Sequence, residues 1–244
     1  PLPWTDLETD ASGRLTEWGW LNYGFEMYYA LLNCGFRISP SAGTASGVHP
    51  VPLGHSRVYV HTGPEFDLDA WLGGLKRGRS FVTSGTMLFA TVDGKPSDEV
   101  IQFEGDYQRT VNIEIEAISE RPLDQIEIVI NGKVSQVADI RATKTDSGAW
   151  RAVAMQPVPI DRTSWIAVRC YERREDGRRR FAHTAPWHIE LDGKPPTPSR
   201  VQVRYILDLL EGEVERNTGR LSSVAINEFA VAIRHYRGLL ERSE

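Results

Sequence analysis

Hydrophobic residues recur at two different spacings along the chain, and the change of spacing divides it into three regions. In residues 1–79 the spacing is three or four, as in "WGWLNYGFEMYYALLNCG", which predicts an amphipathic helix ended by Gly35. Five residues define the apolar side of this helix: Leu21, Phe25, Tyr28, Tyr29 and Leu32. The stretch "DLDAWLGGLKRGRSFVT" predicts a second helix, with Asp67 as its N-cap and Gly78 at its end.

Two shorter stretches of the same region are typical of strands. "FRISPSAG" predicts a short strand, although Pro40 disfavours an interior position in a sheet. "SRVYVHT" predicts another strand, in which Val58 and Val60 share one face. Residues 1–79 are therefore expected to form a mixed α/β segment.

From residue 80 to residue 193 the spacing changes to two. Apolar positions alternate with polar ones in "VNIEIEA" and "IEIVI", and Asn131-Gly132 follows as a strong signal for a two-residue hairpin turn. In "SWIAVRCYE", Ile166, Val168 and Cys170 are expected to face inward. Several short strands separated by turn signals predict an antiparallel β-sandwich.

Residues 194–244 form the third region. The proline-rich stretch "DGKPPTPS", residues 192–199, leads into it and is typical of a linker, and two apolar stripes after it predict a pair of helices. We expect this helical hairpin to pack back on the rest of the chain, with self-association through its stripes as the alternative. The predicted fold class is α+β, and we expect Trp71, Leu72 and Leu75 to be buried against the sandwich or these helices.

Composition narrows the class of protein. The 244 residues are 41% hydrophobic and 25% charged, as in an ordinary soluble globular protein, and no apolar run is long enough to span a bilayer. A net charge of -5 argues against a nucleic-acid partner. Cys34 and Cys170 lie far apart, without the spacing of a metal site or a disulfide framework. The chain begins with Pro1 rather than methionine, which favours a fragment or a processed form.

The six histidines lack the local spacings typical of metal sites. His49 and His55 are weak metal-ligand candidates, because they flank two prolines in one loop and could converge on an ion. His183, in "AHTAP", is expected to hold a corner by hydrogen bonding rather than to act in catalysis. "ERREDGRRR" is interpreted as a charged hairpin tip rather than an anion site, and Ser46 has no nearby base to activate it.

Two long stretches carry a family resemblance. "YYALLNCGFRISPSAGTASGVHPVPLGHSRVYV" and "AWLGGLKRGRSFVTSGTMLFATVDGKP" resemble the carboxy-terminal part of the carbaryl-hydrolase-like branch of PHP (polymerase and histidinol phosphatase) metallohydrolases. "AHTAPWHIELDGKP" resembles the sandwich segment that follows in those proteins. The resemblance implies that residues 1–79 are the end of a metal-binding β/α barrel whose last strand is "FRISPSAG". In such barrels, metal-activated water hydrolyses a phosphoester or an ester.

The resemblance also bears on the metal ligands. Many PHP proteins supply an aspartate and a histidine after the last barrel strand, and this chain has Ala45 and Gly47 at those positions. Neither side chain can donate to a metal, so no cofactor is expected in this chain. A divalent metal would belong to a full-length parent, whose upstream barrel portion is the expected partner.

Two classes of function follow. The first is the carboxy-terminal portion of a PHP-type hydrolase, with catalytic ligands largely absent from this chain, and the second is a non-catalytic β-sandwich binding module. For the first, the polar residues Thr44, Ser46, His55 and Arg57 are the candidates for a substrate-facing rim.

Overall fold

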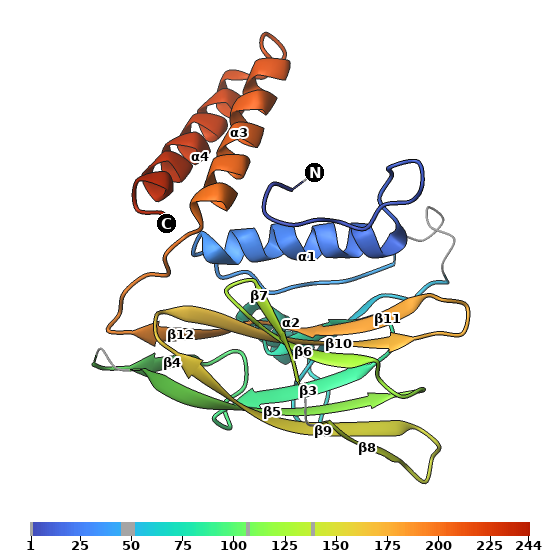
Figure 1. The fold of residues 1–244 in the computed structure, drawn as a ribbon. Coiled ribbons are helices and arrows are strands. Elements are labelled where there is room, and N and C mark those ends of the chain that lie inside the picture. Colours follow the sequence, from blue (N-terminus) through green and yellow to red (C-terminus); the bar gives the residue numbers. More distant parts are fainter. Residues whose placement is uncertain (1, 45–51, 106–107, 138–139) are drawn as a thin grey trace. The chain divides into compact units, whose positions relative to one another are not determined.

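The structure is a computed structural model that describes residues 2–44, 52–105, 108–137 and 140–244 (Figure 1). Contacts divide the chain into two compact units: Ile38–Lys194, and Pro1–Arg37 together with Pro195–Glu244. None of the described helices is long and apolar enough to cross a membrane.

The first of these units, residues 38–194, contains one helix and all of the described strands. These are β1 (Arg57–Val60), α2 (Leu68–Arg77), β2 (Ser80–Thr83), β3 (Met87–Val92), β4 (Val100–Phe103), β5 (Arg109–Ser119), β6 (Gln125–Ile130), β7 (Lys133–Gln136), β8 (Arg141–Lys144), β9 (Trp150–Ile160), β10 (Ser164–Arg173), β11 (Arg179–Thr184) and β12 (Trp187–Leu191). The strands form two stacked, largely antiparallel sheets, which confirms the predicted β-sandwich (Figure 1).

The larger sheet is organised around β10, which pairs with β6, β11 and β12. β6 pairs with β7, β11 continues through β2 to β1, and β12 pairs with β4. The smaller sheet has the order β3-β5-β9-β8. Alternate side chains of β5, β6 and β10 fill one shared core. The apolar residues that recur at every second position therefore form the inner faces of the sandwich, as expected.

The predicted Asn131-Gly132 hairpin turn and the predicted caps of α2 are confirmed. Asn131 and Gly132 have φ angles of 50° and 85° and connect β6 to β7 as a two-residue hairpin. The Asp67 side chain accepts a hydrogen bond from the Ala70 N–H at 2.7 Å, and Gly78 ends α2 at a φ of 86°. Both glycines occupy the left-handed region, where a side chain would be strained.

β10 departs from simple alternation. Ile166, Val168 and Cys170 are fully buried, as predicted, but the intervening residues of the strand are buried as well. One of these is Arg169, whose Nε donates to a Glu127 carboxylate oxygen at 2.5 Å. Both faces of β10 are therefore covered, and the buried charge of Arg169 is paired.

Two expectations for the first region are wrong. Residues 36–44 form no strand, because Pro40 has no N–H to donate to a ladder, and β1 pairs instead with β2. Leu72 is 51% exposed, whereas Trp71 and Leu75 are partly buried. The reason is that α2 approaches β1 through the buried Gly74, whose position for a Cβ lies 2.6 Å from a Val60 methyl group.

The second unit, residues 1–37 with 195–244, is helical. It contains α1 (Glu17–Asn33), α3 (Arg200–Arg216) and α4 (Ser223–Glu241). Ala30 and Cys34 pack with Val203 and Tyr236 in one core, and the buried Asn33 amide donates to Gln202 at 2.9 Å. This confirms the helical hairpin and shows that α1 is part of what it packs against.

Candidate functional site

Three of the four predicted rim residues, Thr44, His55 and Arg57, are among the described residues and lie at or near the start of β1. Thr44 is fixed there, since its hydroxyl oxygen accepts a hydrogen bond from the Ser56 N–H at 3.0 Å. The His55 N–H donates to the Pro52 carbonyl oxygen at 3.1 Å in a turn. Arg57 begins β1, whereas Ser46 and the weak ligand candidate His49 lie outside the described residues. The structure thus brings Thr44, His55 and Arg57 to one segment.

These residues do not fit a metal site in the part of the chain that the structure describes. No group of three or more His, Cys, Asp and Glu side chains there is placed to hold an ion. A metal needs three or four such ligands, and His55 alone cannot supply them. Cys34 and Cys170 are free and buried, and burial raises the pKa of Cys34 to about 11 and that of Cys170 to about 12.

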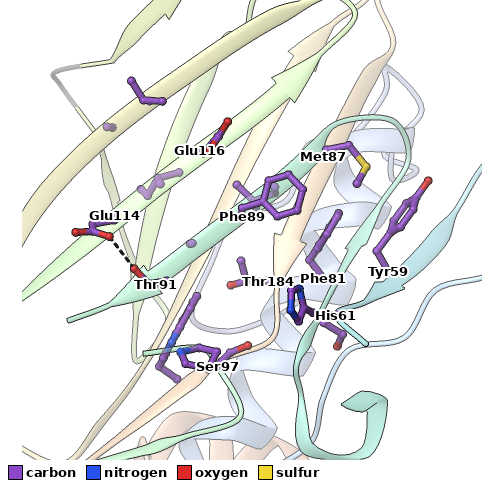
Figure 2. Close-up of a pocket in the computed structure, with 18 of the residues that line it drawn as sticks. Tyr59, His61, Phe81, Met87, Phe89, Thr91, Ser97, Glu114, Glu116 and Thr184 are labelled. Atoms are coloured by element: carbon purple, nitrogen blue, oxygen red, sulfur yellow. Dashed lines mark hydrogen bonds between the residues drawn. The ribbon is translucent and has the colours of Figure 1, made fainter. Parts of the chain in front are cut away.

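A cavity of about 1300 Å³ in the sandwich is lined by residues of both sheets (Figure 2). One wall comes from β1, β2 and His61 directly after β1, and the side chains of Tyr59, His61 and Phe81 point toward the cavity. The opposite wall comes from β3 and its neighbour β5. The cavity exists because β1 and β2 extend the larger sheet alongside β3, the edge strand of the smaller one.

Aromatic rings form a continuous wall in this cavity. Tyr59 stacks on Phe81 with ring centroids 5.3 Å apart, and Phe89 of β3 meets Phe81 edge-on at 5.9 Å. The Arg57 guanidinium lies 5.9 Å from the Tyr59 ring centroid, a cation–π contact. Arg57 therefore joins the predicted rim to the aromatic wall.

Polar groups line the remainder of the cavity. Ser97 donates to the Gly78 carbonyl oxygen at 2.6 Å, so its hydroxyl is already engaged. On the other side, a Glu114 carboxylate oxygen accepts from the Thr91 hydroxyl at 3.1 Å (Figure 2). Glu116 pairs with Arg151 at 2.6 Å. The arrangement suits recognition of a ligand with apolar and hydrogen-bonding groups more than nucleophilic chemistry.

The other sequence candidates have structural roles. His183 is 1% exposed, and its Nδ1–H donates to the Thr184 carbonyl oxygen at 2.6 Å. Burial is the largest cause that lowers the pKa of His183, to about 4, so the ring is neutral near pH 7. The charged "ERREDGRRR" segment forms the hairpin between β10 and β11, as expected, and its Arg174 pairs with Glu172 and with Glu120.

Sequence reasoning missed the cavity itself. Its walls combine residues from β1, β2, β3 and β5 that only the strand pairing brings together, as in the register between Tyr59 and Phe81. The available signal was the uncharged run "MLFATV" directly after a turn. A scan against protein-family models gives no match for this chain, and neither does a search of curated proteins.

Proposed function

We propose that this chain acts as the carboxy-terminal portion of a PHP-type metal-dependent hydrolase that cleaves a phosphoester or an ester. The motifs of residues 28–60 and 70–96 carry the proposal, because they resemble that family over two separate stretches. In this proposal an upstream barrel portion holds the divalent metal, since the described residues of this chain do not fit one. The barrel-end origin of residues 1–79 is part of the same proposal.

The role proposed for this chain is to border the substrate. Arg57 carries a fixed positive charge and is held against Tyr59, so it suits the anionic oxygens of a phosphoester or of a hydrolytic transition state. The Thr44–Ser56 hydrogen bond holds Thr44 beside the segment that contains His55 and Arg57. Ser46 is the fourth residue of the proposed rim.

The test uses the full-length parent protein. Turnover of p-nitrophenyl phosphate and p-nitrophenyl acetate with Mn²⁺ or Zn²⁺ should fall about tenfold or more in His55→Ala or Arg57→Ala, without a change in Tm. Arg220→Ala removes an exposed arginine remote in sequence and is the matched control. Unaltered turnover in both rim variants, or an upstream reading frame without a His-x-His motif, would refute the proposal.

A second candidate function is favoured by the cavity. A non-catalytic binding module needs a concave surface with apolar walls and a few polar groups, which the aromatic wall and Glu114 supply. Self-association through the C-terminal helices is a separate proposal, supported by Val224, Ile226 and Val231, which are exposed on α4. Sedimentation velocity over a range of concentrations tests it, and a single concentration-independent species of monomer mass would exclude it.

A further inference from the structure

β3 differs from the other strands that form sheet edges in the described part of the chain. β1, β4, β7 and β8 are each four residues long, and three of them carry Lys or Arg side chains. β3 has six residues, "MLFATV", with no charge and no proline. Charged and short edges discourage the addition of another strand, so β3 lacks the usual protection.

The cavity runs along the edge of β3. All residues from Met87 to Thr91 line it, although successive side chains of a strand point to opposite faces. Among the described strands β3 pairs only with β5, so its other edge is left without a strand partner, and Figure 2 shows Met87, Phe89 and Thr91 along the cavity.

Backbone groups of β3 point into this space. The Asp93 N–H donates to the Asn112 carbonyl oxygen of β5, whereas Val92 exchanges backbone hydrogen bonds with Lys95 on the other side. Because the direction alternates along an antiparallel strand, Leu88 and Ala90 point the same way as Val92. Within the described residues, the N–H and C=O groups of Leu88 and Ala90 have no backbone partner outside their own sheet ladder.

We propose that β3 is a strand-addition site that binds an extended peptide segment with alternating apolar and basic residues. The peptide pairs with the N–H and C=O groups of Leu88 and Ala90. Its apolar side chains contact Tyr59 and Phe81, which line the opposite wall. This inference goes beyond the proposed hydrolase function and does not depend on metal chemistry.

Charge complementarity specifies the basic residues. Glu114 extends over β3 to reach Thr91 at 3.1 Å, and among the described residues it has no ion-pair partner. Glu116 lies two residues further along the same face of β5 and pairs with Arg151 on β9, the strand on the other side of β5 from β3. A lysine of the added strand that lies beside Thr91 therefore meets a carboxylate that is free to accept it.

The probe is a blocked, fluorescein-labelled heptapeptide of alternating valine and lysine, and binding is measured by fluorescence anisotropy. Two analogues are N-methylated, one at every valine and one at every lysine. In an extended peptide the N–H groups of alternate residues point to opposite edges of the strand, so each analogue loses the N–H groups of one edge only. One analogue should therefore bind at least tenfold more weakly than the unmethylated peptide, and the other should bind as well as it does. Equal affinity of the two analogues, high or low, would overturn the proposal. A peptide with four consecutive valines followed by three lysines controls for charge attraction.

Protein variants provide the matching test. Ala90→Pro removes the N–H that points into the cavity without removing a hydrogen bond to β5, and should weaken peptide binding at least tenfold. Ala90→Thr keeps the N–H and should bind like the wild type. If Ala90→Pro does not fold, the N-methylated peptides decide the matter with the wild-type chain. If sedimentation velocity shows that the wild type is a dimer and that Ala90→Pro is a monomer, the edge of β3 binds a second copy of the chain. That result would overturn the proposal of a peptide partner.

Discussion

His183 shows how one buried side chain makes stability depend on pH. Burial, together with the nearby Arg169 guanidinium, lowers its pKa from 6.5 to about 4, although the hydrogen bond with Thr184 acts in the opposite direction. The unfolded chain therefore binds a proton below about pH 6.5 that the native chain does not take up until about pH 4. Because the unfolded state holds more protons in this window, the free energy of unfolding decreases as the pH falls through it.

The corresponding prediction compares the wild type with His183→Gln. Between pH 7 and pH 4, the wild type should lose up to roughly 3 kcal/mol more unfolding free energy than the variant, because only the wild type has this buried imidazole. Urea unfolding at half-unit pH steps measures both curves, and the carboxylates that the two proteins share cancel in the difference. Parallel curves would contradict a neutral, buried His183.

At the scale of single elements, α2 depends on a close contact made by a glycine. Gly74 is buried, and a Cβ added there would lie 2.6 Å from the Val60 Cγ1 atom of β1. A Cβ at Gly73 would meet only the end of the flexible Arg77 side chain at 3.2 Å. Alanine substitutions at these two neighbouring glycines therefore measure the effect of helix propensity and the effect of helix packing separately.

We expect opposite effects from alanine at these two positions. Gly73→Ala should raise the free energy of unfolding by about 0.5–1 kcal/mol, because alanine favours a helix interior. Gly74→Ala should lower it by about 1–2 kcal/mol, since overpacking against Val60 exceeds the same propensity gain. Urea or thermal unfolding measures both variants. Equal effects would mean that α2 does not rest on β1 through Gly74.

The same elements show what the sequence can predict. Caps and turns are local, so Asp67, Gly78 and the Asn131-Gly132 hairpin were predictable from a few residues each. The buried face of α2 was not, because it is set by what the helix meets, and Gly74 rather than Leu72 lies toward β1. For the same reason the aromatic wall, with its cross-strand pair Tyr59 and Phe81, appears only once the strands are paired.

At the scale of the whole molecule, metal content follows from the ligand set. The sequence has Ala45 and Gly47 where the resembling family supplies ligands, and the described residues contain no cluster of three ligands. After dialysis, elemental analysis should find well under one zinc, manganese or iron per chain. One tightly held ion per chain would contradict this expectation, and His49 and His55 would be the first residues to replace.

The two ends of the chain fold together as one helical unit, although the whole sandwich separates them in sequence. Ala30 of α1 and Cys34, the C-cap of α1, share a core with Val203 and Tyr236, and the buried Asn33 amide donates a hydrogen bond to Gln202. An amphipathic helix of this length is marginal without its packing partners. The stability of α1 should therefore depend on residues 195–244.

Removing residues 195–244 tests this dependence. The far-UV circular dichroism of the truncated chain should lose the helical signal of α1 in addition to that of α3 and α4, because an isolated α1 would expose its apolar side to water. Adding the 195–244 segment as a separate peptide should restore helicity, whereas a peptide carrying Val203→Asp and Tyr236→Asp should not, since both changes place a charge in the shared core. A truncated chain that keeps the helical signal of α1 would show that this helix is stabilised without the C-terminal segment.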